Sequence, residues 1–398
     1  MARQSRWISP TVVLLAAAAP SGIAAADTIT YAKEGTRRTI QADVLGRTAR
    51  GEWVARTPDG QDHYIPSADV VDWKDKGSPA APYSREQLKS LLRAEFGGGF
   101  YFVDTNHFLV VSNCDSKLAR QAGTLLERAY HAFRGHFAGK GAFPMETLRQ
   151  PLVAVVFRTR REYLEETSNR IGRVPEWSAG VYSPRTNRFY LFDAFEGSLD
   201  GGPVRNRSAL ASPGGASGRM STRNVESLIH EATHQLAFNL GIHQRHGENP
   251  AWFVEGLATY FETADDSSQE GWKRGGELNA GRLAEFARIF PRLKPGFLDE
   301  LVANDSGFRE RDVGEAYALS WALTYYLMKV KQTGCARYIR AVQARGLSAC
   351  TPAERLADFK TAFGATPKGL ERDFSRYMAG VLLSELKKAP APSTAAAR

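Results

Sequence analysis

The chain has 398 residues, of which 43 % are hydrophobic and 24 % charged, with a formal net charge of +9. This composition is that of a globular protein, and the length allows two or three domains. The arginines are scattered rather than clustered, so nucleic-acid binding is not indicated. The simplest interpretation of the charge is general solubility, although a basic exported protein could also bind anionic cell-wall or membrane surfaces.

Residues 1–26 have the features of a secretory signal peptide. Two arginines precede an apolar stretch from Thr11 to Ala19, and three alanines before Asp27 form a small-residue cleavage site. The apolar stretch is too short to span a bilayer, and no other segment is long and apolar enough to do so. An uncleaved anchor or a lipoprotein is the alternative, but no cysteine follows the apolar stretch. We therefore expect the mature protein to be secreted or periplasmic.

Residues 27–76 are predicted to form a small all-β module with the pattern of an SH3-like barrel. Glycines and a Pro-Asp-Gly turn separate short strand-like runs, which are Thr28–Tyr31, Arg38–Leu45, Glu52–Arg56 and Asp62–Ile65. The module could bind a cell-wall component or could simply pack against the rest of the protein. Residues 77–84 begin with a Gly/Ser/Pro/Ala-rich run and are a predicted linker.

Residues 85–280 show helical and strand-like patterns in turn, which predicts a mixed α+β domain. Helices are expected over Arg85–Glu95, Lys117–Phe137 and Arg161–Thr167. Strands are expected over Tyr101–Val103, Phe108–Ser112 and Val153–Phe157, followed by a hairpin of Gly180–Ser183 and Arg188–Phe192. A segment rich in Gly, Ser, Pro and Ala, Gly197–Gly218, is either a mobile loop over a site or a disordered insertion.

An H-E-x-x-H motif, His230 to His234, lies inside a predicted helix from Asn224 to Leu240. Two histidines four residues apart lie about 40° from each other around a helix axis, so both can bind one metal ion. Glu231 is offset to the side, where it can take a proton from a metal-bound water. Two unrelated histidines on a surface helix are the alternative, and a second element argues against it.

That element is a second helix, with Asn249 as its predicted N-cap and Pro250 at its first helical position, which is expected to run to about Thr263. The short connection predicts that the two helices are antiparallel neighbours. At 1.5 Å per residue, His234 lies about 9 Å from the end of its helix and Glu255 about 7.5 Å inside the next. Glu255 can therefore lie level with the histidines. Two imidazoles and one carboxylate, with a fourth position left to water, make a catalytic zinc site.

Three further residues are candidates for supporting these ligands. Glu262 shares the helix face of Glu255 and could orient a zinc-binding histidine, but a solvated carboxylate would have the same pattern. Gln235 and Asn239 are weaker candidates for the same role.

The blocks H-E-A-T-H-Q and W-F-V-E-G-L-A-T-Y-F-E resemble those of the gluzincin metallopeptidases, the thermolysin-like group. They are similar in particular to blocks of a bacterial, secreted domain family of that type. The likeness covers roughly Phe100 to Leu383 and is loose outside the blocks. It implies zinc (Zn²⁺) ligation by both motif histidines and Glu255, with Glu231 as general base, on a small mixed sheet followed by a helical region. The G-A-M-E-N block of the group's exopeptidases is absent, which argues against an aminopeptidase that anchors a free amine.

The resemblance also suggests an oxyanion donor and a substrate-binding strand. Gluzincins stabilise the oxyanion with a tyrosine or histidine from the downstream region, and Tyr317 begins the matching helix. A core tyrosine is the alternative, and His243 and His246 are fallback donors that are more simply surface histidines. Part of Ala179–Phe192 would be an edge strand beside the cleft, where an extended peptide can add; a buried hairpin would have the same sequence.

Residues 281–386 are predicted to form a helical subdomain, and residues 387–398 a disordered Ala/Pro-rich tail. The expected helices are Arg282–Phe290, Asp299–Asn304, Glu315–Met328, Ala336–Gln343, Thr351–Phe363 and Lys368–Leu383. Export permits disulfides, and Cys335 could pair with Cys350, which would leave Cys114 over.

The sequence therefore predicts a secreted α+β zinc metallopeptidase of the gluzincin type, in which a glutamate base activates water to hydrolyse peptide bonds. The competing hypothesis is a non-catalytic or non-peptide-amide protein on the same scaffold that binds cell-wall polymers through residues 27–76. The intact motif argues against a dead enzyme. We expect a peptide or protein substrate, and no integral membrane segment after signal cleavage.

Overall fold

The computed structural model describes residues 27–138, 145–176, 178–193, 220–265, 267–268, 271–308 and 313–388, and the statements below concern these residues. The predicted signal peptide, the predicted loop Gly197–Gly218 and residues 389–398 of the predicted tail lie outside them. Among the described helices, none combines the length and the apolar character that a bilayer crossing requires.

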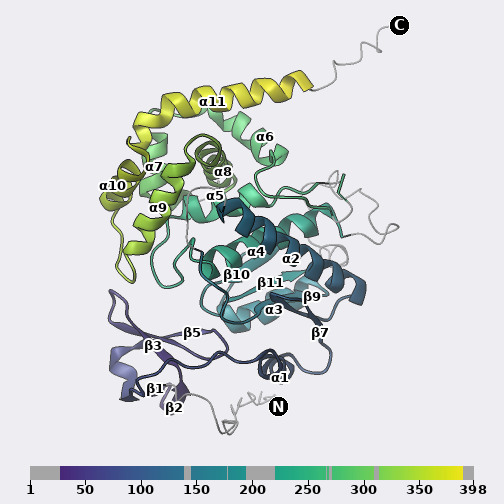
Figure 1. The fold of residues 1–398 in the computed structure, drawn as a ribbon, viewed down its shortest axis with the longest axis vertical. Helices are drawn as coiled ribbons and strands as arrows, with labels where there is room; N and C mark the ends of the chain where they lie inside the picture. The colour runs from purple at the N-terminus through teal and green to yellow at the C-terminus, as the bar shows by residue number, and fades with distance from the viewer. Residues whose placement is uncertain are drawn as a thin grey trace, which may run out of the picture.

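The N-terminal part is all-β and lies at one end of the molecule (Figure 1). It has two three-stranded antiparallel sheets, β2-β1-β6 (Thr36–Gln41, Thr28–Lys33 and Val70–Lys74) and β3-β4-β5 (Asp43–Arg47, Glu52–Arg56 and Asp62–Pro66). The prediction of a single strand over Arg38–Leu45 is wrong, because the chain passes from the first sheet to the second at the buried Ala42. Strand β6 was not predicted; Val71 and Trp73 are exposed there and alternate with charged residues.

A five-stranded mixed sheet of order β10-β11-β9-β8-β7 follows. Its strands are β7 (Tyr101–Asp104), β8 (Phe108–Ser112), β9 (Leu152–Phe157), β10 (Gly180–Ser183) and β11 (Arg188–Phe192). The inner strands β8, β9 and β11 are parallel and buried throughout, as a strand covered on both faces must be. Each edge strand is antiparallel to its neighbour: β7 pairs with β8, and β10 pairs with β11.

Successive side chains of the inner strands point to opposite faces of the sheet, and helices cover both faces. On one face, Phe108, Val110 and other apolar side chains join a core with helices α2 (Ser116–Ala138) and α4 (Thr222–Asn239). On the other face, Leu109, Val111 and their neighbours pack with α1 (Arg85–Phe96) and α3 (Arg160–Ile171). The helix that carries the H-E-x-x-H motif is therefore fixed on a fully packed sheet.

The remaining helices form the other end of the molecule (Figure 1). They are α5 (Ala251–Phe261), α6 (Ala280–Ile289), α7 (Phe297–Ala303), α8 (Val313–Val330), α9 (Gln332–Ala344), α10 (Pro352–Phe363) and α11 (Pro367–Lys388), with short 3-10 turns at Phe290–Arg292 and Ser306–Phe308. Every helix predicted after residue 281 is present, with shifted ends, and α11 continues two residues into the predicted tail. One continuous apolar core runs from strand β8 to α11.

Backbone contacts join the N-terminal sheets to the rest of the chain. In the predicted linker, Tyr83 N–H donates to Pro58 O at 2.9 Å, and Ala80 N–H donates to the Asp43 carboxylate. Gly60 has φ +83°, a left-handed backbone conformation that favours glycine, and a Cβ there would lie 2.4 Å from the end of the Gln150 side chain, so the turn lies close to Gln150. The three cysteines are all in described residues and are free thiols, so Cys335 and Cys350 do not pair.

Candidate zinc centre

Helix α4 presents the motif to a cleft because its other face is bound to the sheet. The Ser221 hydroxyl accepts the Asn224 N–H and caps the helix, which begins at Thr222, slightly before the predicted start. Its end is marked by Gly241, whose φ of +80° suits the left-handed turn after a helix. The predicted inward residues, including Leu228 and Ile229, are fully buried.

The predicted N-cap of the second ligand helix is wrong. Asn249 uses its side chain to close the preceding loop: Nδ2 donates to Gln244 O at 2.7 Å and to Gly247 O at 3.2 Å, and Oδ1 accepts the Gln244 N–H. The first turn of α5 is capped from far along the chain, because Ala251 N–H donates to Asp305 Oδ1 at 2.9 Å. A local pattern could not reveal this tertiary cap.

The two ligand helices run in opposite directions, as predicted. The ring of Phe253, near the start of α5, lies 5.1 Å from the ring of His243, just after the end of α4. Glu262, directly after α5, contacts His230 in the middle of α4. At Gly256, a Cβ would lie 2.6 Å from Ser320 O, so a glycine lets α5 approach α8 closely.

The side chains of His230, His234 and Glu255 converge, and their candidate ligand atoms all lie within 4.8 Å of one another. The two Nε2 atoms are 3.1 Å apart, and Glu255 Oε2 lies 3.4 Å and 3.5 Å from them. This carboxylate oxygen is buried and makes no hydrogen bond. Two imidazole nitrogens and an otherwise unsatisfied carboxylate oxygen fit the ligand set of a three-residue zinc site with an open fourth position.

Glu262 makes the contact that was predicted for it. Its Oε2 lies 2.6 Å from His230 Nδ1, so Nε2 of the same ring is left for a metal. Its Oε1 accepts from Asn279 Nδ2 at 3.0 Å and from Arg282 Nε at 3.4 Å. The contacts of Asn279 and Arg282 with Glu262 were not predicted. Asn279 is also the N-cap of α6, and this local role gives no sign in the sequence of its contact with Glu262.

The electrostatics of the cluster favour a cation. Burial opposes protonation of His230, yet the carboxylates of Glu255 and Glu262 raise its pKa well above the ordinary value. Burial would raise the pKa of Glu255, but the two motif histidines lower it overall. Burial, with the charge of Glu255 as a smaller cause, raises the pKa of Glu231 despite the opposing histidines. The site thus concentrates negative charge around two imidazoles.

The candidate ligands line a cleft of about 880 Å³ bounded by β10, α4, α5, α6 and α8. The predicted edge strand is β10, which lies at the edge of the sheet and contributes Gly180 and Val181 to the cleft wall. Glu231 packs against this strand so closely that a Cβ on Gly180 would lie 2.9 Å from Glu231 Cγ. The candidate base is therefore held between the metal ligands and the edge strand.

Tyr317, near the start of α8, faces the same cleft. Its ring centre lies 6.4 Å from that of His230, and the Arg282 guanidinium lies 5.2 Å from the ring centre on its face. Burial, together with the charges of Glu255 and Glu231, raises the pKa of its hydroxyl. The hydroxyl consequently stays protonated at neutral pH and can donate a hydrogen bond.

Gln235 and Asn239 do not support the ligands. Gln235 Nε2 donates to Val153 O at 3.1 Å and to Asn187 O at 2.8 Å, which ties α4 to the sheet. Asn239 exchanges hydrogen bonds with the Asn187 side chain.

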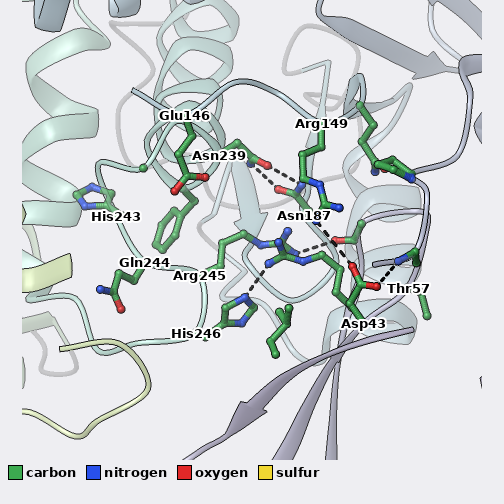
Figure 2. Close-up of a pocket in the computed structure, with 18 of the residues that line it drawn as sticks. Asp43, Thr57, Glu146, Arg149, Asn187, Asn239, His243, Gln244, Arg245 and His246 are labelled. Carbon is green, nitrogen blue, oxygen red and sulfur yellow. Dashed lines mark hydrogen bonds and ion pairs between the residues drawn. The ribbon is translucent and has the colours of Figure 1, made fainter. Parts of the chain in front are cut away.

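His243 and His246 are not among the residues that line the candidate cleft, so their assignment as fallback oxyanion donors is wrong. They line a separate cavity of about 500 Å³ between the N-terminal sheets and the helices (Figure 2). His246 Nε2 lies 2.7 Å from a nitrogen of Arg56. Burial lowers the pKa of His246 to about 4, and burial together with the charge of His234 lowers that of His243 to about 3.

Residues 224–346 match a sequence family described as "Protein of unknown function (DUF1570)". The matched segment begins two residues inside α4 and continues past α8, so it contains His230, Glu231, His234, Glu255 and Tyr317. No curated protein matches the chain. The similarity therefore covers the candidate centre, and its description assigns no activity.

Proposed function

We propose that the protein is a zinc-dependent hydrolase that cleaves peptide bonds. The observation that carries this proposal is the convergence of His230, His234 and Glu255 at one point of a cleft, with Glu231 beside them. Zinc held there would supply a Lewis acid that polarises the scissile carbonyl and lowers the pKa of water.

In this proposal one side chain transfers a proton and a second donates a hydrogen bond to the oxyanion. Glu231 takes the proton of the attacking water and returns it to the leaving nitrogen, because its carboxylate lines the cleft next to the ligands. Tyr317 donates its hydroxyl hydrogen to the oxygen that gains negative charge, from the opposite wall formed by α8. Glu262 holds the His230 ring by its Nδ1 and keeps Nε2 directed at the cleft.

The position of β10 supports an extended peptide as the substrate. Within the described sheet this strand pairs only with β11, so no strand covers its other edge. On β10, Gly180 O accepts the Ser178 hydroxyl and the Tyr182 N–H bonds to Glu231, and an added strand would compete with these contacts. A peptide that adds there as a further strand would pass along the cleft wall beside Glu231. A hydrolase of a non-peptide amide has no such need for an edge strand.

We further propose a gluzincin plan for the α+β domain of residues 85–280 together with the helical subdomain of residues 281–386, and an SH3-like barrel for residues 27–76. The mixed sheet before the motif helix and the helices after it support the first assignment, and two three-stranded antiparallel sheets support the second. Export to the periplasm or the exterior rests on the leader-like residues 1–26. In the competing proposal, the barrel binds cell-wall polymers and the cleft is not catalytic.

The test is cleavage of a mixed peptide library by the mature chain, with and without a chelator, alongside elemental analysis of the bound metal. Glu231→Gln should lower turnover by roughly 10²- to 10⁴-fold while the zinc content is unchanged. Glu255→Ala should lower the zinc content itself. Glu86→Gln, an exposed substitution of the same kind on α1, is the matched control and should change neither.

Three results would contradict the proposal. An active Glu231→Gln protein would overturn the assignment of the base. An unchanged metal content in Glu255→Ala would overturn the third ligand. Chelator-insensitive cleavage by the wild-type chain would overturn zinc dependence.

A further inference from the structure

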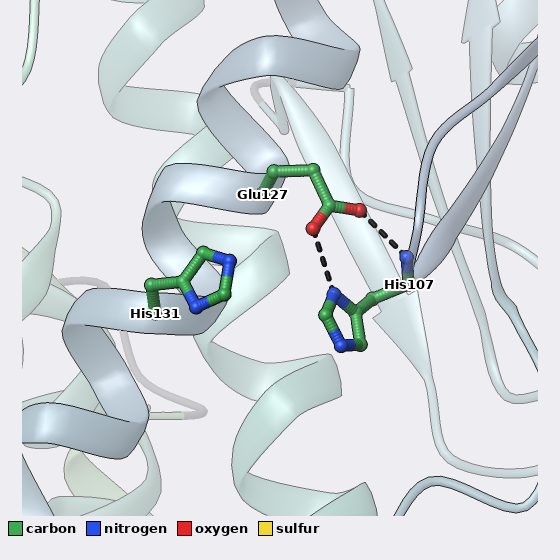
Figure 3. A group of neighbouring side chains, drawn as sticks. All are labelled: His107, Glu127 and His131. Carbon is green, nitrogen blue, oxygen red and sulfur yellow. Dashed lines mark hydrogen bonds and ion pairs between the residues drawn. The ribbon is translucent and has the colours of Figure 1, made fainter.

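A second group of metal-ligating side chains lies away from the zinc cleft. Glu127 and His131 occupy positions i and i+4 on α2, and His107 lies in the tight turn between β7 and β8 (Figure 3). Because β7 and β8 are the two strands farthest from β10 in the sheet order, this group is separated from the cleft by the width of the sheet.

His107 is held rigidly by its neighbours. Its backbone N–H donates to Glu127 Oε1 at 2.6 Å, and its ring Nδ1 lies 2.7 Å from Glu127 Oε2. Its carbonyl accepts the Leu152 N–H at 2.9 Å, and its ring stacks on Tyr130 with centres 3.6 Å apart. A ligand fixed in this way has little conformational entropy left to lose when a metal binds.

The three side chains also have suitable positions and charges. One ligand atom from each of His107, Glu127 and His131 lies within 4.8 Å of the others. Both oxygens of the Glu127 side chain face His107, Oε1 at its backbone N–H and Oε2 at its ring Nδ1. His131 is exposed and can turn toward an arriving ion. Two imidazoles and one carboxylate are the ligand types that Zn²⁺ and its neighbouring transition metals accept.

We propose that His107, Glu127 and His131 form a second zinc-binding site, which clamps the β7–β8 turn to helix α2. The carboxylate that now bonds to His107 Nδ1 would share the ion with that ring, and His131 would provide the third ligand. This inference does not depend on catalysis in the cleft. The competing outcome is a metal-free Glu127–His107 pair that only ties the turn to the helix.

The test counts zinc on the mature chain after chelator treatment, by calorimetric titration with Zn²⁺ and by elemental analysis after gel filtration. The wild-type chain should bind two equivalents. His131→Ala should bind one, because loss of a direct ligand weakens the site by more than the roughly 10- to 100-fold cost of losing an outer-shell partner. Thr124→Ala, another exposed residue of α2, is the control and should still bind two.

The double variant His230→Ala/His234→Ala separates this inference from the proposed function. It should retain one equivalent, and adding His131→Ala should remove it. If His131→Ala binds as much zinc as the wild type, the second site is refuted. If the wild type binds one equivalent that depends on His131 and not on His230, the second site stands and the cleft assignment fails.

Discussion

Replacement of Glu262 by Gln tests how the candidate centre is oriented. The change keeps an oxygen acceptor near His230 Nδ1 but removes the negative charge from a buried contact of 2.6 Å. A hydrogen bond to a charged group contributes about 1.5–3 kcal/mol, against about 0.5–1.5 kcal/mol for a neutral pair. The difference of about 1–1.5 kcal/mol corresponds to a loss of about tenfold in zinc affinity. This agrees with the lower end of the roughly 10- to 100-fold range for outer-shell partners.

The assay is the dissociation constant for zinc, measured by competition with a chelator of known affinity. Glu285→Gln is the matched control, because Glu285 accepts from Arg282 at 3.0 Å and does not contact His230 in the described structure. We expect weaker zinc binding in Glu262→Gln, wild-type affinity in Glu285→Gln, and recovery of any peptidase activity at saturating zinc. Equal affinities in Glu262→Gln and the wild type would refute the argument, and so would equal losses in both variants.

Three further substitutions test the geometry of the cleft and its helices, and a fourth, on α11, is a control for the effect of replacing a helical glycine. Tyr317→Phe should lower kcat by roughly 10²- to 10³-fold with zinc content unchanged, as measured by steady-state kinetics; wild-type kcat would exclude it as an oxyanion donor. Gly180→Ala places a Cβ 2.9 Å from Glu231 Cγ and should lower activity without a large change in Tm. Gly256→Ala places a Cβ 2.2 Å from a hydroxyl of α8 and should destabilise the fold by about 1–3 kcal/mol in urea unfolding. Gly380→Ala, with open space around it on α11, should instead stabilise by about 0.5–1 kcal/mol.

The elements whose apolar residues recur at strand or helix spacing in the sequence were predicted well. The hairpin strands Gly180–Ser183 and Arg188–Phe192 have the predicted bounds, and α2 and α8 were found because their apolar residues recur at helical spacing. Strand β6 was missed because its alternating run is short and Val71 and Trp73 are exposed, so that only Val70 packs against the core of the N-terminal sheets. The break at Ala42 was missed because the residues on both sides of it favour strands.

In the candidate centre too, the features that depend on local sequence could be predicted, and those that depend on the packing of distant elements could not. The relation of His230 to His234 is set by one helix, and the depth of Glu255 could be worked out from helix rise and a short loop. The contacts of Asn279 and Arg282 with Glu262 could not be worked out, because they depend on where α6 packs. The misassigned cap at Asn249 has the same origin, since the actual acceptor comes from Asp305.

The charge balance of the cleft gives an independent physical argument for a divalent ion. Four carboxylates line the cleft: Glu231, Glu255 and Glu262 near the two motif histidines, and the half-buried Glu226. Arg282 brings one guanidinium, which also pairs with Glu285. With neutral histidines, the negative charges therefore outnumber the positive ones by at least two, and burying charges without partners would cost several kcal/mol each. A protonated His230, whose pKa the carboxylates raise, offsets only part of this charge. One divalent cation would offset two of these negative charges and leave both histidines free to act as ligands, which supports the proposal that the cleft binds a metal such as zinc.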